Sequence, residues 1–178
     1  MSSRTRRAVL VCGALLGAAV LAVPFARGPL LGGFSRLLVL GLRDVTWIAS
    51  DDLARSLAQA APTPVLLDTR SEAEFGVSRL PGARRLDPGR PDIHSLASLP
   101  KDTPLVVYCA VGYRSAQIAR RLREAGFSRV ANLEGGVFRW VREGRPLVDH
   151  AGPATRIHPY DPVSGWLFVE PEHRGPAE

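Results

Sequence analysis

The sequence predicts an α/β domain built on a parallel sheet with helices on both faces. Three short apolar runs, at 65–67, 105–108 and 130–133, have the length and composition of buried strands. Segments with a helical spacing of apolar residues separate them. Strands that are apolar along nearly their whole length are typical of parallel sheets covered on both faces. The length of 178 residues suits one such domain with extensions at its two ends.

The first part of the domain is expected to contain a strand, a helix and a break. The strand covers 45–49, and Ser50 is suited to cap a helix over 51–60, because its hydroxyl can accept a free N–H group of the first turn. The segment Ala-Pro-Thr-Pro at 61–64 ends that helix. The buried strand at 65–67 then follows.

A charged segment comes directly after this strand. Ser71 to Glu74 forms a capping box, in which serine and glutamate each accept a backbone N–H of the other's residue, so a short helix is expected. An ion pair between Glu74 and Arg70 is a further possibility. Asp68, at the strand end, is expected to orient backbone N–H groups of a neighbouring loop and not to act as a catalytic acid.

Shorter elements are expected around the central strand. A Pro-Gly turn precedes a brief strand over 84–86, and a small helix is expected over 92–99. A last helix, after two adjacent glycines, is expected to end at Glu143.

The central strand, 105–108, is followed directly by Cys109. A tight loop containing Gly112 follows, and then a helix that Gly126 terminates, because glycine readily adopts the left-handed conformation found there. Loop N–H groups and a helix N-terminus suit this position to an anionic sulfur, and the thiolate is the nucleophilic form of cysteine. A cysteine after an apolar strand is often only a small buried hydrophobe. The glycine, the helix and Arg114 favour the functional interpretation.

Residues 109–115, Cys-Ala-Val-Gly-Tyr-Arg-Ser, resemble the active-site loop of the rhodanese family of sulfurtransferases. The resemblance extends from about residue 45 to residue 148. Further segments similar to family motifs occur in the family's order: Asp68-Thr69-Arg70 with Glu74-Phe75, Leu80-Pro81-Gly82-Ala83, and Gly135-Gly136 with Trp140. The chain departs from the family at Arg79, where a histidine is usual.

The resemblance implies a three-layer rhodanese-like fold and sulfurtransferase activity, with no cofactor and no metal. Cys109 would carry sulfur, as a persulfide, from a small anionic donor such as thiosulfate to cyanide or a thiol. The residues expected to bind the donor are Arg114, Ala110, Val111, Gly112, Tyr113, Ser115 and Arg79. Arg114 would hold the donor because its planar fork matches an oxyanion, whereas Arg79 is either a charge at the pocket mouth or a solvated turn residue. Asp68 and Arg70 would support the site, and Arg70 is largely structural in the family.

Three other functions stay open. Phosphatases and arsenate reductases of the cysteine-loop type have five residues between cysteine and arginine, whereas four lie between Cys109 and Arg114, and a smaller ring leaves less room for a tetrahedral oxyanion. A non-catalytic binding module of the same fold is a second alternative. The third is a single-thiol redox sensor at the membrane, which would need an outside thiol because the domain has no second cysteine.

Charge and cysteine content narrow the class of partner. The net charge of +6 comes almost wholly from arginine and fits anionic substrates or a membrane surface. No block of five like charges and no basic run interleaved with aromatic residues occurs, so we expect no nucleic acid partner. Cys12 and Cys109 are the two cysteines, and their distant positions exclude a disulfide framework.

The N-terminus has the pattern of a membrane-targeting segment. Arg4, Arg6 and Arg7 precede an uncharged stretch over 8–26. As a helix this stretch spans about 28 Å, against about 30 Å of bilayer hydrocarbon. We expect an uncleaved anchor in a bacterial-type inner membrane, with the domain on the periplasmic side according to the positive-inside bias. The alternative is a signal peptide cleaved after Ala22 and a domain released to the periplasm.

The chain is therefore expected to have four parts: 1–27, an anchor or signal segment; 28–44, a juxtamembrane amphipathic linker; 45–150, the rhodanese-like domain; and 151–178, a Pro-rich C-terminal extension. A helix over 30–43 would have an apolar face suited either to a membrane interface or to packing on the domain. The C-terminal extension is expected to cover an apolar edge of the domain. Capping of the active site by the segment around His158 is the other possibility.

Overall fold

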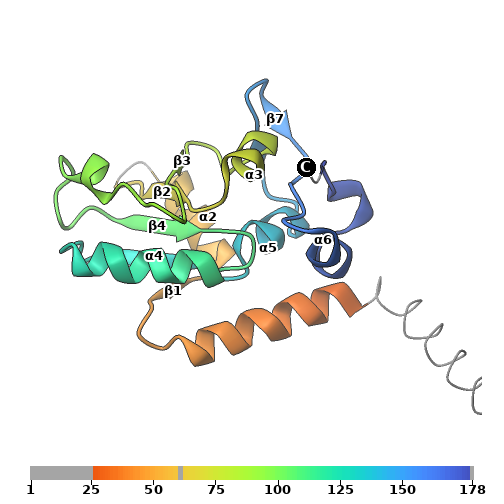
Figure 1. Ribbon diagram of the computed structural model, residues 1–178, viewed down its shortest axis with the longest axis horizontal. Helices are drawn as coiled ribbons and strands as arrows, with labels where there is room; N and C mark the ends of the chain where they lie inside the picture. The colour runs from red at the N-terminus through yellow and green to blue at the C-terminus, as the bar shows by residue number, and fades with distance from the viewer. Residues whose placement is uncertain (1–25, 60–61, 177–178) are drawn as a thin grey trace, which may run out of the picture.

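The computed structural model of the protein describes residues 26–59 and 62–176. Five parallel strands form its main sheet, in the order β1-β5-β4-β2-β3 (Figure 1). Their bounds are β1 Trp47–Ile48, β2 Val65–Asp68, β3 Arg84–Arg85, β4 Leu105–Tyr108 and β5 Val130–Leu133. The predicted α/β fold with a central parallel sheet is confirmed.

Helices and a small hairpin complete the described part of the chain. The α-helices are α2 Ser50–Ala58, α3 Glu72–Val77, α4 Tyr113–Glu124, α5 Gly136–Arg142 and α6 Pro162–Phe168, preceded by helical residues 26–41. Two 3-10 turns cover Ile93–Leu96 and Pro171–His173, and β6 Leu147–Val148 pairs antiparallel with β7 Pro153–Ala154.

The alternation of side chains along β4 divides the core into two layers. Val106 and Tyr108 pack on one face of the sheet, in a cluster that includes the apolar side chains of α5 and Leu53 of α2. Leu105 and Val107 pack on the opposite face with the apolar stripe of α4. Because successive strand residues point to opposite faces, a continuous apolar run produces this three-layer arrangement.

Three elements differ from the sequence prediction. The strand expected over 45–49 pairs only at its two residues in β1, because β1 is an edge strand with β5 as its one neighbour in the sheet. Ser50 is not the N-cap: it is the first residue of α2, and its hydroxyl is buried. The helix expected over 92–99 is a single 3-10 turn, since only Leu96 in that turn is buried and no apolar stripe supports a longer helix.

The helix over residues 26–41, orange in Figure 1, runs along α5 and α6. Leu31 is buried in the core, and the Phe34 ring stacks on Phe168 of α6 with 5.9 Å between ring centroids. Arg27 donates a hydrogen bond of 2.9 Å from Nε to the carbonyl of Trp166. Of the two arrangements considered for this segment, the structure has it packed on the domain.

The predicted hydrophobic N-terminal helix lies almost wholly outside the described residues. All but the last residue of the stretch 8–26 lies outside the described residues. Among the residues that are described, no helix combines the length and the apolar character needed to cross a bilayer.

Candidate active site

Cys109 lies at the carboxyl end of β4, where parallel sheets usually place their sites. It is a free thiol, and only 1% of the residue is exposed. The backbone N–H of Gly112 points at its sulfur, with 3.2 Å between N and Sγ. Gly112 adopts a φ of +104°, and a side chain there would press on the Trp47 ring. Glycine therefore lets the loop turn tightly enough to direct this N–H at the sulfur.

The N-terminus of α5 holds the Cys109 loop in place through backbone hydrogen bonds. The N–H of Val137 donates to the carbonyl of Cys109 at 2.9 Å, and that of Phe138 donates to the carbonyl of Ala110 at 3.1 Å. Gly136, with a φ of +56°, lies so close to the Cys109 loop that a side chain would collide with the carbonyls of Cys109 and Ala110. The motif of adjacent glycines thus positions the Cys109 loop through two backbone hydrogen bonds.

Arg114, in the first turn of α4, is bound to Glu74 from α3. Its two terminal nitrogens donate to the two carboxylate oxygens at 2.9 and 2.7 Å. The Tyr160 ring covers the guanidinium, with 4.6 Å from Cζ to the ring centroid. Arg114 is therefore held along one edge by a carboxylate and on one face by an aromatic ring.

Both partners of this ion pair are charged at neutral pH. Burial alone would raise the pKa of Glu74, but hydrogen bonds from Arg114 and from the Ser71 backbone outweigh it and lower that pKa. Burial opposes the charge of Arg114 as well, yet the hydrogen bond to Glu74 and the electrostatic attraction of Cys109 raise the pKa of the guanidinium. Arg114 thus keeps a full positive charge near Cys109.

The possible ion pair between Glu74 and Arg70 is wrong, because each residue has another partner. Arg70 bonds the Asp68 carboxylate, with Nη2 2.6 Å from Oδ2, and donates to the carbonyl of Ser78. Asp68 and Arg70 are fully buried. Burial opposes ionisation of Arg70, but Asp68 raises its pKa above the ordinary value. Asp68 also accepts the backbone N–H of Arg70, so it organises its own turn and not a neighbouring loop.

The recorded contacts of Arg79 are to residues outside the Cys109 loop. Its backbone exchanges two hydrogen bonds with Val148, and its guanidinium lies over the Phe75 ring and donates to the carbonyl of Asp149. These contacts attach the turn at 79–82 to the end of the domain near β6.

The remaining predicted loop residues differ in exposure. Ala110 is buried, Val111 is half-buried against the core, and the side chain of Tyr113 is exposed. The Ser115 hydroxyl is buried and bonds no other group within the described residues.

Two residues that hold this site were not predicted from the sequence. Asn132, on β5, donates a 2.8 Å hydrogen bond to the carbonyl of Gly112. Tyr160 reaches Arg114 from the C-terminal extension. An asparagine inside an otherwise apolar strand was a signal that could have been used, since a buried amide needs partners. Capping of the active site by the segment around His158 was one of the two alternatives for the C-terminal extension, but no local pattern pointed to Tyr160 itself.

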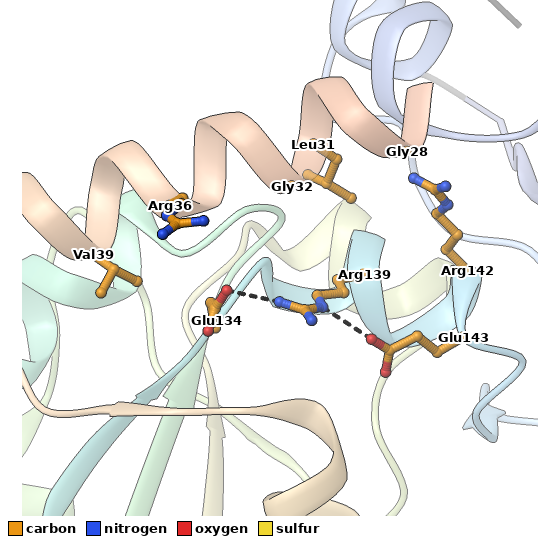
Figure 2. Close-up of a pocket in the computed structure, with 9 residues that line it drawn as sticks. All are labelled: Gly28, Leu31, Gly32, Arg36, Val39, Glu134, Arg139, Arg142 and Glu143. Atoms are coloured by element: carbon orange, nitrogen blue, oxygen red, sulfur yellow. Dashed lines mark hydrogen bonds and ion pairs between the residues drawn. The ribbon is translucent and has the colours of Figure 1, made fainter. Parts of the chain in front are cut away.

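A separate cavity of about 760 Å³ lies between helix 26–41 and α5 (Figure 2). Its charged groups largely neutralise one another: Figure 2 shows Arg139 between Glu134 and Glu143, and it bonds both. The residues that line it do not include Cys109 or Arg114. It is therefore a different place from the cysteine site.

A family model described as the rhodanese-like domain matches residues 50–143, which is more than half of the chain. The chain belongs to the rhodanese-like domain family. The match includes Cys109, Arg114 and Glu74, and it stops before the C-terminal extension that carries Tyr160.

Individual relatives and solved structures agree with this assignment. A protein named sulfurtransferase from Allochromatium vinosum is 36% identical over 108 residues, covering 61% of this chain and 99% of that protein. The rhodanese-like domain of an Anabaena protein has a similar structure, with a TM-score of 0.53 and 26% identity over 58% of this chain and 78% of the other. A thiosulfate sulfurtransferase from Pseudomonas aeruginosa shares the fold, with a TM-score of 0.55 and 23% identity over 75% of this chain and 25% of the other.

Proposed function

We propose that this protein is a sulfurtransferase that carries a sulfane sulfur as a persulfide on Cys109. The observation that carries the proposal is the sulfur of Cys109 at the end of β4 with the Gly112 N–H directed at it. The relative named sulfurtransferase that this chain spans almost completely supports the same reaction class.

In the first half of the proposed reaction the Cys109 thiolate attacks the outer sulfur of a donor such as thiosulfate. A bond forms between the two sulfurs, the S–S bond of the donor breaks, and its electron pair leaves on sulfite. The negative charge now lies on the outer sulfur of the persulfide. Loop N–H groups between Ala110 and Ser115, together with the start of α4, stabilise that charge.

In the second half an acceptor takes the outer sulfur. Cyanide attacks it, thiocyanate leaves, and the thiolate of Cys109 is restored; a thiol acceptor would receive the sulfur in the same way. Covalent catalysis of this kind gives ping-pong kinetics.

Arg114 is the group that we propose to attract an anionic donor. Its charge is near Cys109, and its outer nitrogens retain donors beyond the two that Glu74 accepts, since a guanidinium has five N–H groups. A donor therefore shares Arg114 with Glu74 and does not find a free guanidinium.

Replacement of the nucleophile tests the proposal. Cys109→Ser is nearly isosteric and should leave the fold intact while it removes transfer of sulfur from thiosulfate to cyanide. The test measures the steady-state rate of thiocyanate formation by the unmodified and the serine proteins. Their unfolding curves are compared as a control for an intact fold. Turnover by the serine variant would refute the persulfide mechanism.

We also propose that residues 8–26 anchor the chain in a bacterial-type inner membrane, with the domain on the periplasmic side. The apolar side chains of Leu30, Leu37 and Leu40, which are exposed on the helix that follows, are consistent with a nearby bilayer surface. The full chain should sediment with membranes and resist a high-salt wash. Recovery of intact full-length chain in the supernatant would contradict the anchor.

A further inference from the structure

One side chain connects the C-terminal extension with the active site. The Tyr160 ring lies over the guanidinium of Arg114, 4.6 Å from Cζ to the ring centroid. In Figure 1, α6, which follows Tyr160, lies at the end of the sheet toward which β4 points. Tyr160 lies beyond residues 50–143, the part matched by the family model, so this contact reaches the site from outside the matched domain.

The backbone around Tyr160 holds the ring in place. Its φ is +71°, and no other non-glycine residue of the described ranges has a left-handed φ. Its N–H donates to Nδ1 of His158 at 3.0 Å, Pro159 packs against Gly165, and Asp161 caps α6. A non-glycine residue keeps such a conformation only where its surroundings fix it, and strain of this kind is often found at functional sites.

The ring changes the environment of the ion pair beneath it. Only 24% of the Arg114 side chain and 3% of the Glu74 side chain are exposed. Where water is kept out, the attraction between the two charges is stronger. A donor with two negative charges must share Arg114 with Glu74, whereas a donor with one charge relies more on the loop N–H groups and loses less affinity.

We propose that Tyr160 is a specificity-determining residue of the donor site. By covering Arg114 it commits the guanidinium to Glu74, and so it disfavours dianionic sulfur donors relative to donors of the same shape with one charge fewer. Tyr160 acts through Arg114 and is therefore a positioning residue. The proposal rests on the sulfurtransferase function and adds the class of donor, namely sulfane donors with a single negative charge.

Thiosulfate and methanethiosulfonate form a matched pair of probes, since a methyl group replaces one oxygen anion. With either donor the Cys109 thiolate forms a bond to the terminal sulfur and the donor's bond to that sulfur breaks. The electron pair leaves on sulfite in one case and on methanesulfinate in the other. Cyanide then removes the sulfur as thiocyanate in a step that both share. The ratio of the two kcat/KM values therefore reports recognition of charge.

The experiment compares the full-length protein with Tyr160→Ala, Tyr160→Phe and Val163→Ala. Val163 is an exposed residue of the same segment and serves as the matched control. Tyr160→Ala should raise the ratio of kcat/KM for thiosulfate to that for methanethiosulfonate by roughly three- to tenfold, mainly through a lower KM for thiosulfate. Tyr160→Phe keeps the ring, so it and the Val163 variant should stay close to the unmodified ratio. Tyr160→Gly, which relaxes the backbone at φ +71°, should behave like the alanine variant and covers the case in which alanine disturbs the fold.

An unchanged ratio in both the alanine and the glycine variants would overturn the proposal, as would a lowered one. Equal losses with both donors would mean that Tyr160 only supports the structure, which also overturns it. These results leave the sulfurtransferase function standing. Absence of turnover by the unmodified protein with either donor would instead refute that function, and the role of Tyr160 with it.

Discussion

Gly136→Ala is the sharpest test of how the two glycines before α5 support the Cys109 loop. An alanine there meets two separate penalties. The first is its left-handed φ of +56°, which costs a residue with a side chain about 1 kcal/mol. The second is steric, because the new methyl group would lie 2.5 Å from the carbonyl oxygen of Ala110 and closer still to that of Cys109. Relief of such overpacking costs about 1–3 kcal/mol more.

Gly144 offers a control that separates the two penalties. Its φ is +69°, but a side chain there would meet no other atom within 4 Å. Gly144→Ala should therefore lower the free energy of unfolding by about 1 kcal/mol, and Gly136→Ala by about 2–4 kcal/mol. Urea denaturation followed by tryptophan fluorescence measures both values. Sulfur transfer should fall only in the Gly136 variant, since the displaced carbonyls belong to the catalytic loop. Equal losses of stability with unchanged activity would refute this account of the loop.

Two further predictions concern the ion pair of Arg114 and Glu74. Arg114→Ala should lower kcat/KM for thiosulfate roughly ten- to a hundredfold through the loss of a charge-assisted hydrogen bond, and Arg114→Lys should recover only part. A smaller effect on methanethiosulfonate is expected, and equal effects would mean that Arg114 only shapes the loop. Because the pKa of Glu74 is lowered in the folded protein, its stabilising contribution is complete above the unfolded pKa of about 4.5 and disappears as the pH falls through the folded pKa. The difference in unfolding free energy between the unmodified protein and Glu74→Gln should thus shrink from about pH 6 to about pH 3, and a constant difference would contradict the ion pair.

The sheet and the position of the nucleophile could be predicted because their signals are local. The apolar run before Cys109 is long enough to define a buried strand, and the glycine and helix that follow define the loop. Pairing of β4 with β2 on one side and β5 on the other satisfies the backbone N–H and C=O groups of this buried strand.

The charge pairing could not be predicted in the same way. Arg70 and Glu74 are four residues apart, so sequence spacing alone suggests that they pair. In the folded chain Asp68 and the carbonyl of Ser78 occupy Arg70, and the capping box turns Glu74 toward Arg114, forty residues away in the sequence. Pairing over that distance depends on the tertiary fold.

The position of Tyr160 is even harder to predict from the sequence than the charge pairing. Its segment has no periodicity, and its left-handed backbone is unusual for a tyrosine. The position of Tyr160 depends on the contact of Pro159 with Gly165 and on the hydrogen bond that the Tyr160 N–H donates to His158. The sequence could place this segment near an edge of the domain but could not choose between covering an apolar edge and capping the active site.

Mass spectrometry of the purified protein after incubation with thiosulfate tests the central claim most directly. The account predicts one added sulfur on the peptide that contains Cys109, its loss when cyanide is then added, and no added sulfur in Cys109→Ser. An unmodified Cys109 peptide in a protein that still produces thiocyanate, or an added sulfur that cyanide does not remove, would contradict the persulfide mechanism.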